Sequence, residues 1–110
     1  MKTKLPDGST LFFKDDEGFV RWCEAHPDGF FWNCGADEDG KIKTVSLLHS
    51  AMYKGKLCPH FRNRNLASGF ADNLTRTHAK VCSTSRKDLE RWAEDYKAGH
   101  GQKRKCSQCM

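Results

Sequence analysis

The most restrictive feature of this 110-residue sequence is a pair of cysteines at its C-terminal end, in the segment KRKCSQCM. Two residues separate Cys106 from Cys109, and basic side chains precede them. A Cys-x-x-Cys pair supplies two thiolates from one tight turn, which is half of a tetrahedral zinc site. The pair therefore predicts that the tail is held by ligands from an earlier part of the chain.

Composition favours metal ligation over disulfide bonds. Hydrophobic residues make up 37% of the chain, so a single small core would benefit from a metal. The start of the chain, MKTKLPDGST, lacks the apolar segment of a signal peptide, and no apolar run approaches the roughly 20 residues of a membrane span. We expect one zinc-binding domain over residues 1–110, without membrane contact, in the reducing cytoplasm, where the six cysteines are ligands or buried side chains.

Two segments have the spacing of amphipathic helices. The first, DDEGFVRWCEAH over residues 15–26, begins with acidic residues that suit a helix N-terminus and is stopped by Pro27. The second lies between a cap at Ser85, with Asp88 three residues later, and a stop at Gly99. Both carry a stripe of large apolar residues that we expect to be buried.

Four segments have strand character. They are residues 10–14, 29–34, 41–50 and 78–83. The middle two flank an acidic turn and predict an antiparallel hairpin, in which Val45, Leu47 and His49 share one face. We expect an α+β fold: a small antiparallel sheet of three to four strands, two helices against one face, and a zinc-stapled loop and tail.

Three arrangements of the cysteines and histidines compete. In the first, His49 and Cys58 join Cys106 and Cys109 around one structural Zn²⁺. In the second, the closed site is formed by Cys58, His60, His78 and Cys82. In the third, the cysteines are mostly buried and inert. A strand over 78–83 disfavours the second arrangement, because it would separate His78 from Cys82 by roughly 13 Å.

The first arrangement is favoured because it gives the tail a reason to be ordered. One zinc ion would join the long segment after His49 to the chain end. His60, His78 and Cys82 remain open as substitutes for a proposed ligand. We expect Cys23 and Cys34, which lie on apolar stripes, to be core residues.

The formal net charge of +5 favours an anionic partner, nucleic acid first. Basic residues near the long loop and the start of the last helix form a candidate phosphate-binding surface: Arg62, Arg64, Arg76, Lys80, Arg86 and Lys87. The sequence has no glycine-rich nucleotide-binding loop. It therefore predicts a non-catalytic module that binds nucleic acid or a nucleic-acid-processing complex. The alternatives are a small phage or mobile-element inhibitor that docks on a host protein complex and a zinc-thiolate alkyl acceptor.

The segments HPDGFFWNC, VSLLHS, LCPHF, HAKVCSTSRKDLERWAEDY and KCSQC together resemble a group of small zinc-binding proteins of bacteria and phages. The resemblance covers about residues 26–109. The His, Cys and final Cys-x-x-Cys order is also distantly similar to the Ada-type zinc modules of DNA alkylation-damage response proteins. The resemblance implies zinc ligands at His49, Cys58, Cys106 and Cys109.

Overall fold

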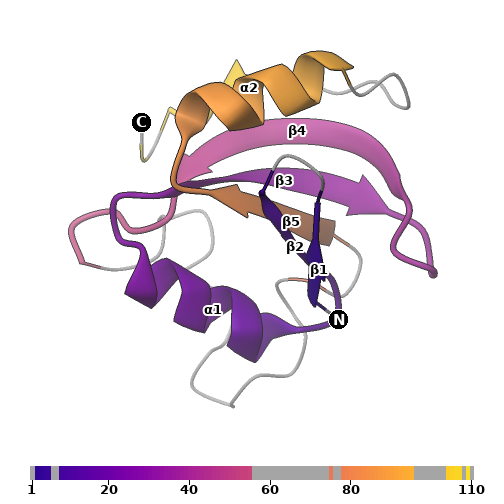
Figure 1. Ribbon diagram of the computed structural model, residues 1–110, viewed down its shortest axis with the longest axis horizontal. Coiled ribbons are helices and arrows are strands. Elements are labelled where there is room, and N and C mark those ends of the chain that lie inside the picture. The colour runs from indigo at the N-terminus through magenta and orange to yellow at the C-terminus, as the bar shows by residue number, and fades with distance from the viewer. Residues whose placement is uncertain are drawn as a thin grey trace.

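The structure, a computed structural model, describes residues 2–5, 8–55, 75, 78–95, 104–107 and 109 (Figure 1). The strands are β1 (Lys2–Lys4), β2 (Thr10–Phe12), β3 (Phe30–Ala36), β4 (Ile42–Ser50), β5 (His78–Ser83) and β6 (Arg104–Lys105). The helices are α1 (Asp16–Ala25) and α2 (Arg86–Asp95). Neither of these helices has the length and apolar character needed to cross a membrane.

All described strands belong to one sheet in the order β1-β2-β5-β3-β4-β6. The first five pair in antiparallel fashion, and β6 runs parallel to β4. The α+β class is confirmed, but the expected count of three to four strands is too low. The missed strands, β1 and β6, have three and two residues with polar sequences, so neither contains an alternating pattern.

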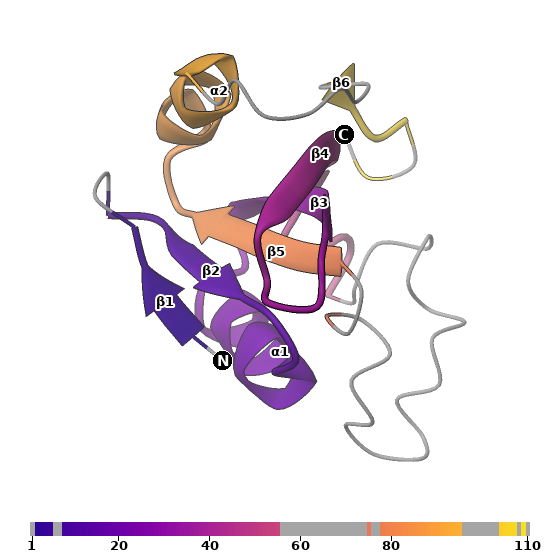
Figure 2. The ribbon, with the colours of Figure 1, turned by 90° about the vertical axis from the view of Figure 1, so that its right-hand side faces the viewer.

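The two helices cover opposite faces of the sheet (Figure 2), so the prediction that both lie against one face is wrong. Phe19, Val20 and Cys23 of α1 pack into one core cluster, whereas Leu89 and Ala93 of α2 pack into another. The central strands show the reason for this arrangement. Successive residues of β5 are all buried from position 79 to position 82, which requires a cover on each side of the strand.

Side chains cap both helices, at the predicted Ser85 for α2 and within the expected acidic residues for α1. The Asp15 carboxylate accepts a 2.9 Å hydrogen bond from the Gly18 amide at the start of α1. The Ser85 hydroxyl accepts a 3.2 Å bond from the Asp88 amide at the start of α2. Each cap satisfies a helical N–H group that has no partner within the helix, and this fixes where the helix starts.

A β-bulge in β4 changes which side chains face α1. Trp32 of β3 lies opposite Leu48, but Cys34, two residues later, lies opposite Val45, three residues away along β4. The extra residue shifts the alternation by one position. Val45 and Leu48 therefore both belong to the α2-side cluster. The expectation that Val45 and His49 share a face is wrong for this reason.

The fully buried Leu89 provides a test of the α2-side core. Leu89→Ala should lower the free energy of unfolding by about 2–5 kcal/mol, because it leaves a cavity between α2 and the sheet. Urea denaturation measures the change. The exposed Arg91→Ala on the same helix is the control and should change stability by less than about 0.5 kcal/mol. Equal effects would contradict the described packing of α2.

Candidate metal centre

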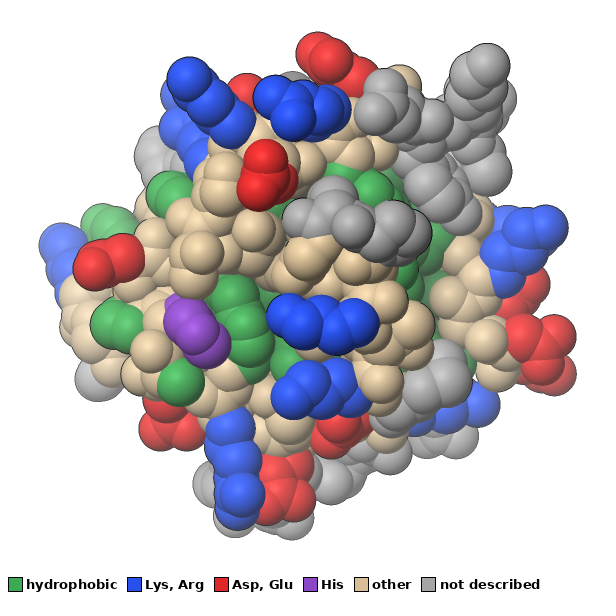
Figure 3. Space-filling view, viewed as in Figure 1, with side chains coloured by type: hydrophobic (Ala, Val, Ile, Leu, Met, Phe, Trp, Pro, Cys, Tyr) green, Lys and Arg blue, Asp and Glu red, His purple; other side chains and the backbone are tan. Residues whose placement is uncertain are grey.

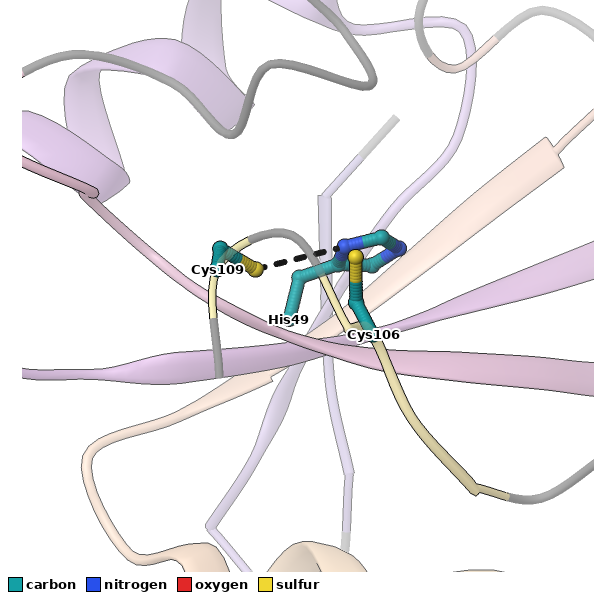
Figure 4. Close-up of side chains that lie close together, drawn as sticks. All are labelled: His49, Cys106 and Cys109. Atoms are coloured by element: carbon teal, nitrogen blue, oxygen red, sulfur yellow. Dashed lines mark hydrogen bonds between the residues drawn. The ribbon is translucent and has the colours of Figure 1, made fainter.

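His49, Cys106 and Cys109 come together at the end of β4 (Figure 4). Their candidate ligand atoms all lie within 4.8 Å of one another, and the residues are 0%, 2% and 6% exposed. The His49 Nδ1 atom is 3.6 Å from the Cys109 Sγ atom. A tetrahedral zinc ion places a nitrogen and a sulfur ligand about 3.5 Å apart. The spacing therefore fits a zinc ion.

The pairing of β6 with β4 brings the two ends of the site together. Leu48 lies beside Lys105, and the Cys106 amide donates a 2.8 Å hydrogen bond to the Leu48 carbonyl oxygen. Cys106 is thereby brought level with His49, the residue after Leu48. The register of these two strands is what positions the first thiol.

Ser50 holds the second thiol. Its amide donates to the Cys109 Sγ atom at 3.3 Å, and its hydroxyl donates to the Cys109 carbonyl oxygen at 3.0 Å. An N–H donor aimed at sulfur favours the thiolate form that a metal needs. Nothing in the sequence marks Ser50 for this role except its position directly after His49.

The His49 ring is held by aromatic contacts. It stacks on Phe31 with a centroid distance of 5.0 Å and an interplanar angle of 23°. Phe31 in turn meets Phe19 of α1 edge to face, at 4.9 Å and 84°. These contacts fix the imidazole plane, so the ligand is oriented before a metal arrives.

The donor set indicates which ions the site could hold. Two thiols and an imidazole are soft to borderline ligands, which suit zinc better than magnesium or calcium. In the described part of the chain, these three residues form the only such cluster of candidate ligands. The structure thus brings together three of the four predicted ligands.

The other predicted ligands lie apart or fall outside the described residues. Cys58 and His60 are outside them. His78 is exposed at the start of β5. Cys82, also on β5, is buried and lies opposite Phe31 of β3. The strand that was expected to separate His78 from Cys82 is confirmed, and neither residue joins the cluster.

The remaining described cysteines are core residues, as expected for Cys23 and Cys34, and Cys82 joins them. Burial raises the pKa of both Cys23 and Cys34 from 9.0 to about 12, and it raises the pKa of Cys82 well above 9.0. The nearby Lys80 ammonium lowers each pKa, but burial has the larger effect. Neutral buried thiols are unreactive, which fits a core role for these three residues.

Lys80 is not available to a phosphate. It is 1% exposed, its ammonium donates a 2.6 Å hydrogen bond to the Asn33 side chain, and it lies 5.9 Å from the centre of the Phe19 ring. The prediction that Lys80 belongs to a phosphate-binding surface is therefore wrong. The physical reason is that β5 is covered on both faces, and its sequence position alone did not reveal this.

The other basic candidates divide into two groups. Arg86 and Lys87 reach the surface at the start of α2, where Arg86 pairs with Glu90 at 2.7 Å. Arg62, Arg64 and Arg76 lie outside the described residues. On the face drawn in Figure 3, Lys and Arg side chains lie in several separate groups among acidic ones.

Comparisons of the chain with protein-family models, curated proteins and solved structures find no match. The resemblance to small zinc-binding proteins therefore stays a prediction. Function has to be inferred from the residues of the chain and their geometry.

The raised pKa of Cys34 predicts a pH-dependent stability. In the folded chain this thiol keeps its proton up to about pH 12, whereas in the unfolded chain it ionises near its ordinary pKa of 9.0. Its contribution to stability is therefore present below pH 9.0 and is lost as the pH rises toward 12. Cys34→Ala should make the fall in urea midpoint between about pH 8 and about pH 10 shallower than in the wild type.

Val45→Ala is the control, because it truncates the same core cluster without removing an ionisable group. It should lower the midpoint equally at both pH values. An unchanged pH dependence in Cys34→Ala would contradict the described burial of this thiol.

Proposed function

We propose that this protein is a non-catalytic binding module stabilised by one structural Zn²⁺ ion. The observation that carries the proposal is the buried cluster of His49, Cys106 and Cys109. Structural zinc sites are closed by four protein ligands, and Cys58 is the proposed fourth. When bound, zinc would neutralise the thiolates and contribute binding free energy to folding.

The chemistry of the surface favours nucleic acid as the partner. The chain has a formal net charge of +5, and Arg86 and Lys87 lie at the surface at the N-terminal end of α2. Cationic side chains there would meet phosphates, and Arg62, Arg64 and Arg76 are proposed to extend this surface. The proposed role of the metal is to hold the segment after Gly55 and the tail in fixed positions on the sheet.

Native mass spectrometry tests the metal. The wild type should carry one zinc ion, and Cys109→Ala and Cys58→Ala should each lower zinc occupancy, because a structural site needs all its ligands. Cys34→Ala is the matched control, because this cysteine is also buried but belongs to the α2-side cluster. It should retain the zinc ion. A wild type without zinc, or equal loss in all three variants, would overturn the proposed metal site.

Salt titration tests the partner. Affinity for mixed DNA or RNA should fall steeply with salt, because each phosphate contact releases counterions. Lys87→Gln should reduce the slope of log affinity against log salt by about 1. Lys54→Gln, which removes an exposed charge beside Tyr53, should leave the slope nearly unchanged. Absence of binding to both nucleic acids at low salt would exclude this partner.

A further inference from the structure

A groove of about 410 Å³ lies on the α2 side of the sheet, between α2 and β6. Figure 2 shows these two elements on either side of the end of β4. Trp32 and Leu48 form the floor of the groove, and Lys105 lies on the β6 side. The α2 side is lined by Arg86, Glu90, Ala93 and Glu94. The volume falls in the range of about 300–1,000 Å³ that is typical of small-ligand sites.

The groove offers three kinds of contact. Its floor is apolar and rigid, since the Trp32 Nε1–H donates a 2.8 Å hydrogen bond to the Leu89 carbonyl oxygen. Its cations, Arg86 and Lys105, suit an anionic group. Its carboxylates, Glu90 and Glu94, lie one helical turn apart and accept hydrogen bonds from amino groups.

A nucleotide carries groups that match all three kinds of contact. Its phosphates match the cations, the flat base matches the apolar floor, and an exocyclic amino group matches a carboxylate. Arg86 already pairs with Glu90, but a guanidinium has five N–H donors and retains some for a phosphate. A base inside a duplex is not free to enter such a groove, so the ligand must be unpaired.

The strands that line the groove also build the metal centre. Leu48 precedes His49, and Lys105, the last residue of β6, precedes Cys106, so consecutive residues belong to the groove and to the cluster. Neighbouring side chains of a strand point to opposite faces. A metal that fixes Cys106 therefore also fixes Lys105 in the wall of the groove.

We propose that this groove binds one unpaired base of single-stranded nucleic acid, with the flanking phosphates on Arg86 and Lys105. The inference rests on the proposed nucleic-acid partner and adds a site and a base preference. Glutamate accepts a hydrogen bond from the amino group of cytosine, which thymine lacks. The groove therefore prefers cytosine to thymine.

Fluorescence anisotropy with labelled oligo(dC) and oligo(dT) of equal length tests the proposal on the zinc-loaded protein. Oligo(dC) should bind about tenfold more tightly, in line with one good base contact. Glu94→Ala should abolish this preference. Glu24→Ala is the matched control, because it removes the same charge from an exposed position on α1 and should keep the preference.

Lys105→Ala should weaken binding of both oligonucleotides by a larger factor than Lys2→Ala, which removes the same charge at the opposite edge of the sheet. Zinc content measured on each variant separates a groove effect from loss of the metal. If Lys105→Ala loses zinc, the test of the groove rests on Glu94→Ala, because Glu94 lies on α2, away from the proposed ligands.

The outcomes distinguish the two proposals. Salt-dependent binding without a base preference, and with equal affinities in Glu94→Ala and Glu24→Ala, would overturn the groove proposal. The proposed function would still stand. Tighter binding of duplex than of either oligonucleotide would also overturn the groove. No binding of any nucleic acid at low salt would overturn both.

Discussion

The C-terminal tail is attached to the sheet through the parallel pairing of β6 with β4, and both proposed sites depend on that pairing. The described attachment is small: two residue pairs and the 2.8 Å hydrogen bond from the Cys106 amide to the Leu48 carbonyl oxygen. One such hydrogen bond contributes about 0.5–1.5 kcal/mol net, which is little against the entropy of ordering a chain end. The contacts of Ser50 with Cys109 add to it. A metal bound by the two cysteines would add the larger share.

The position of the His49 ring depends in turn on the aromatic side chains that it packs against. The ring rests on Phe31, which rests on Phe19, so α1 reaches the cluster through two aromatic contacts. Ordinary strand alternation places His49 on this side of the sheet and Leu48 on the other, and the β4 bulge puts Val45 on the same face as Leu48. Two consecutive residues of β4 thus belong to different faces, His49 to the α1-side cluster and Leu48 to the floor of the groove.

Much of the fold could be predicted because the longer elements carry local signals. The caps at Asp15 and Ser85 and the turn before β4 are encoded within a few residues, and the structure contains them. The face that each helix covers is a long-range property, and a helical stripe does not specify it. The bulge could not be predicted either, because alternation was the only available guide to β4. The strands β1 and β6 exist through pairing with neighbours and not through their own sequence pattern.

The candidate site could be predicted in part for a related reason. Cys106, Cys109 and His49 belong to residue types whose chemistry is specific, so their types and spacing carried information. A lysine has many roles, and the basic character of Lys80 gave no sign of its burial beside Asn33. Trp32, Leu48 and Lys105 become neighbours only after the sheet has formed, so no local pattern marks the groove.

The alternation in β4 and β6 has a consequence for how the sequence can vary. Substitutions at Leu48 or Lys105 change the groove directly, whereas the candidate ligands His49 and Cys106 lie on the opposite face. Insertion or deletion of one residue between the bulge and His49 would exchange the two faces and turn the imidazole toward α2. Insertion of one residue between Lys105 and Cys106 would misalign the first thiol with His49. Variation in chain length near the tail is therefore far more restricted than variation in side chains.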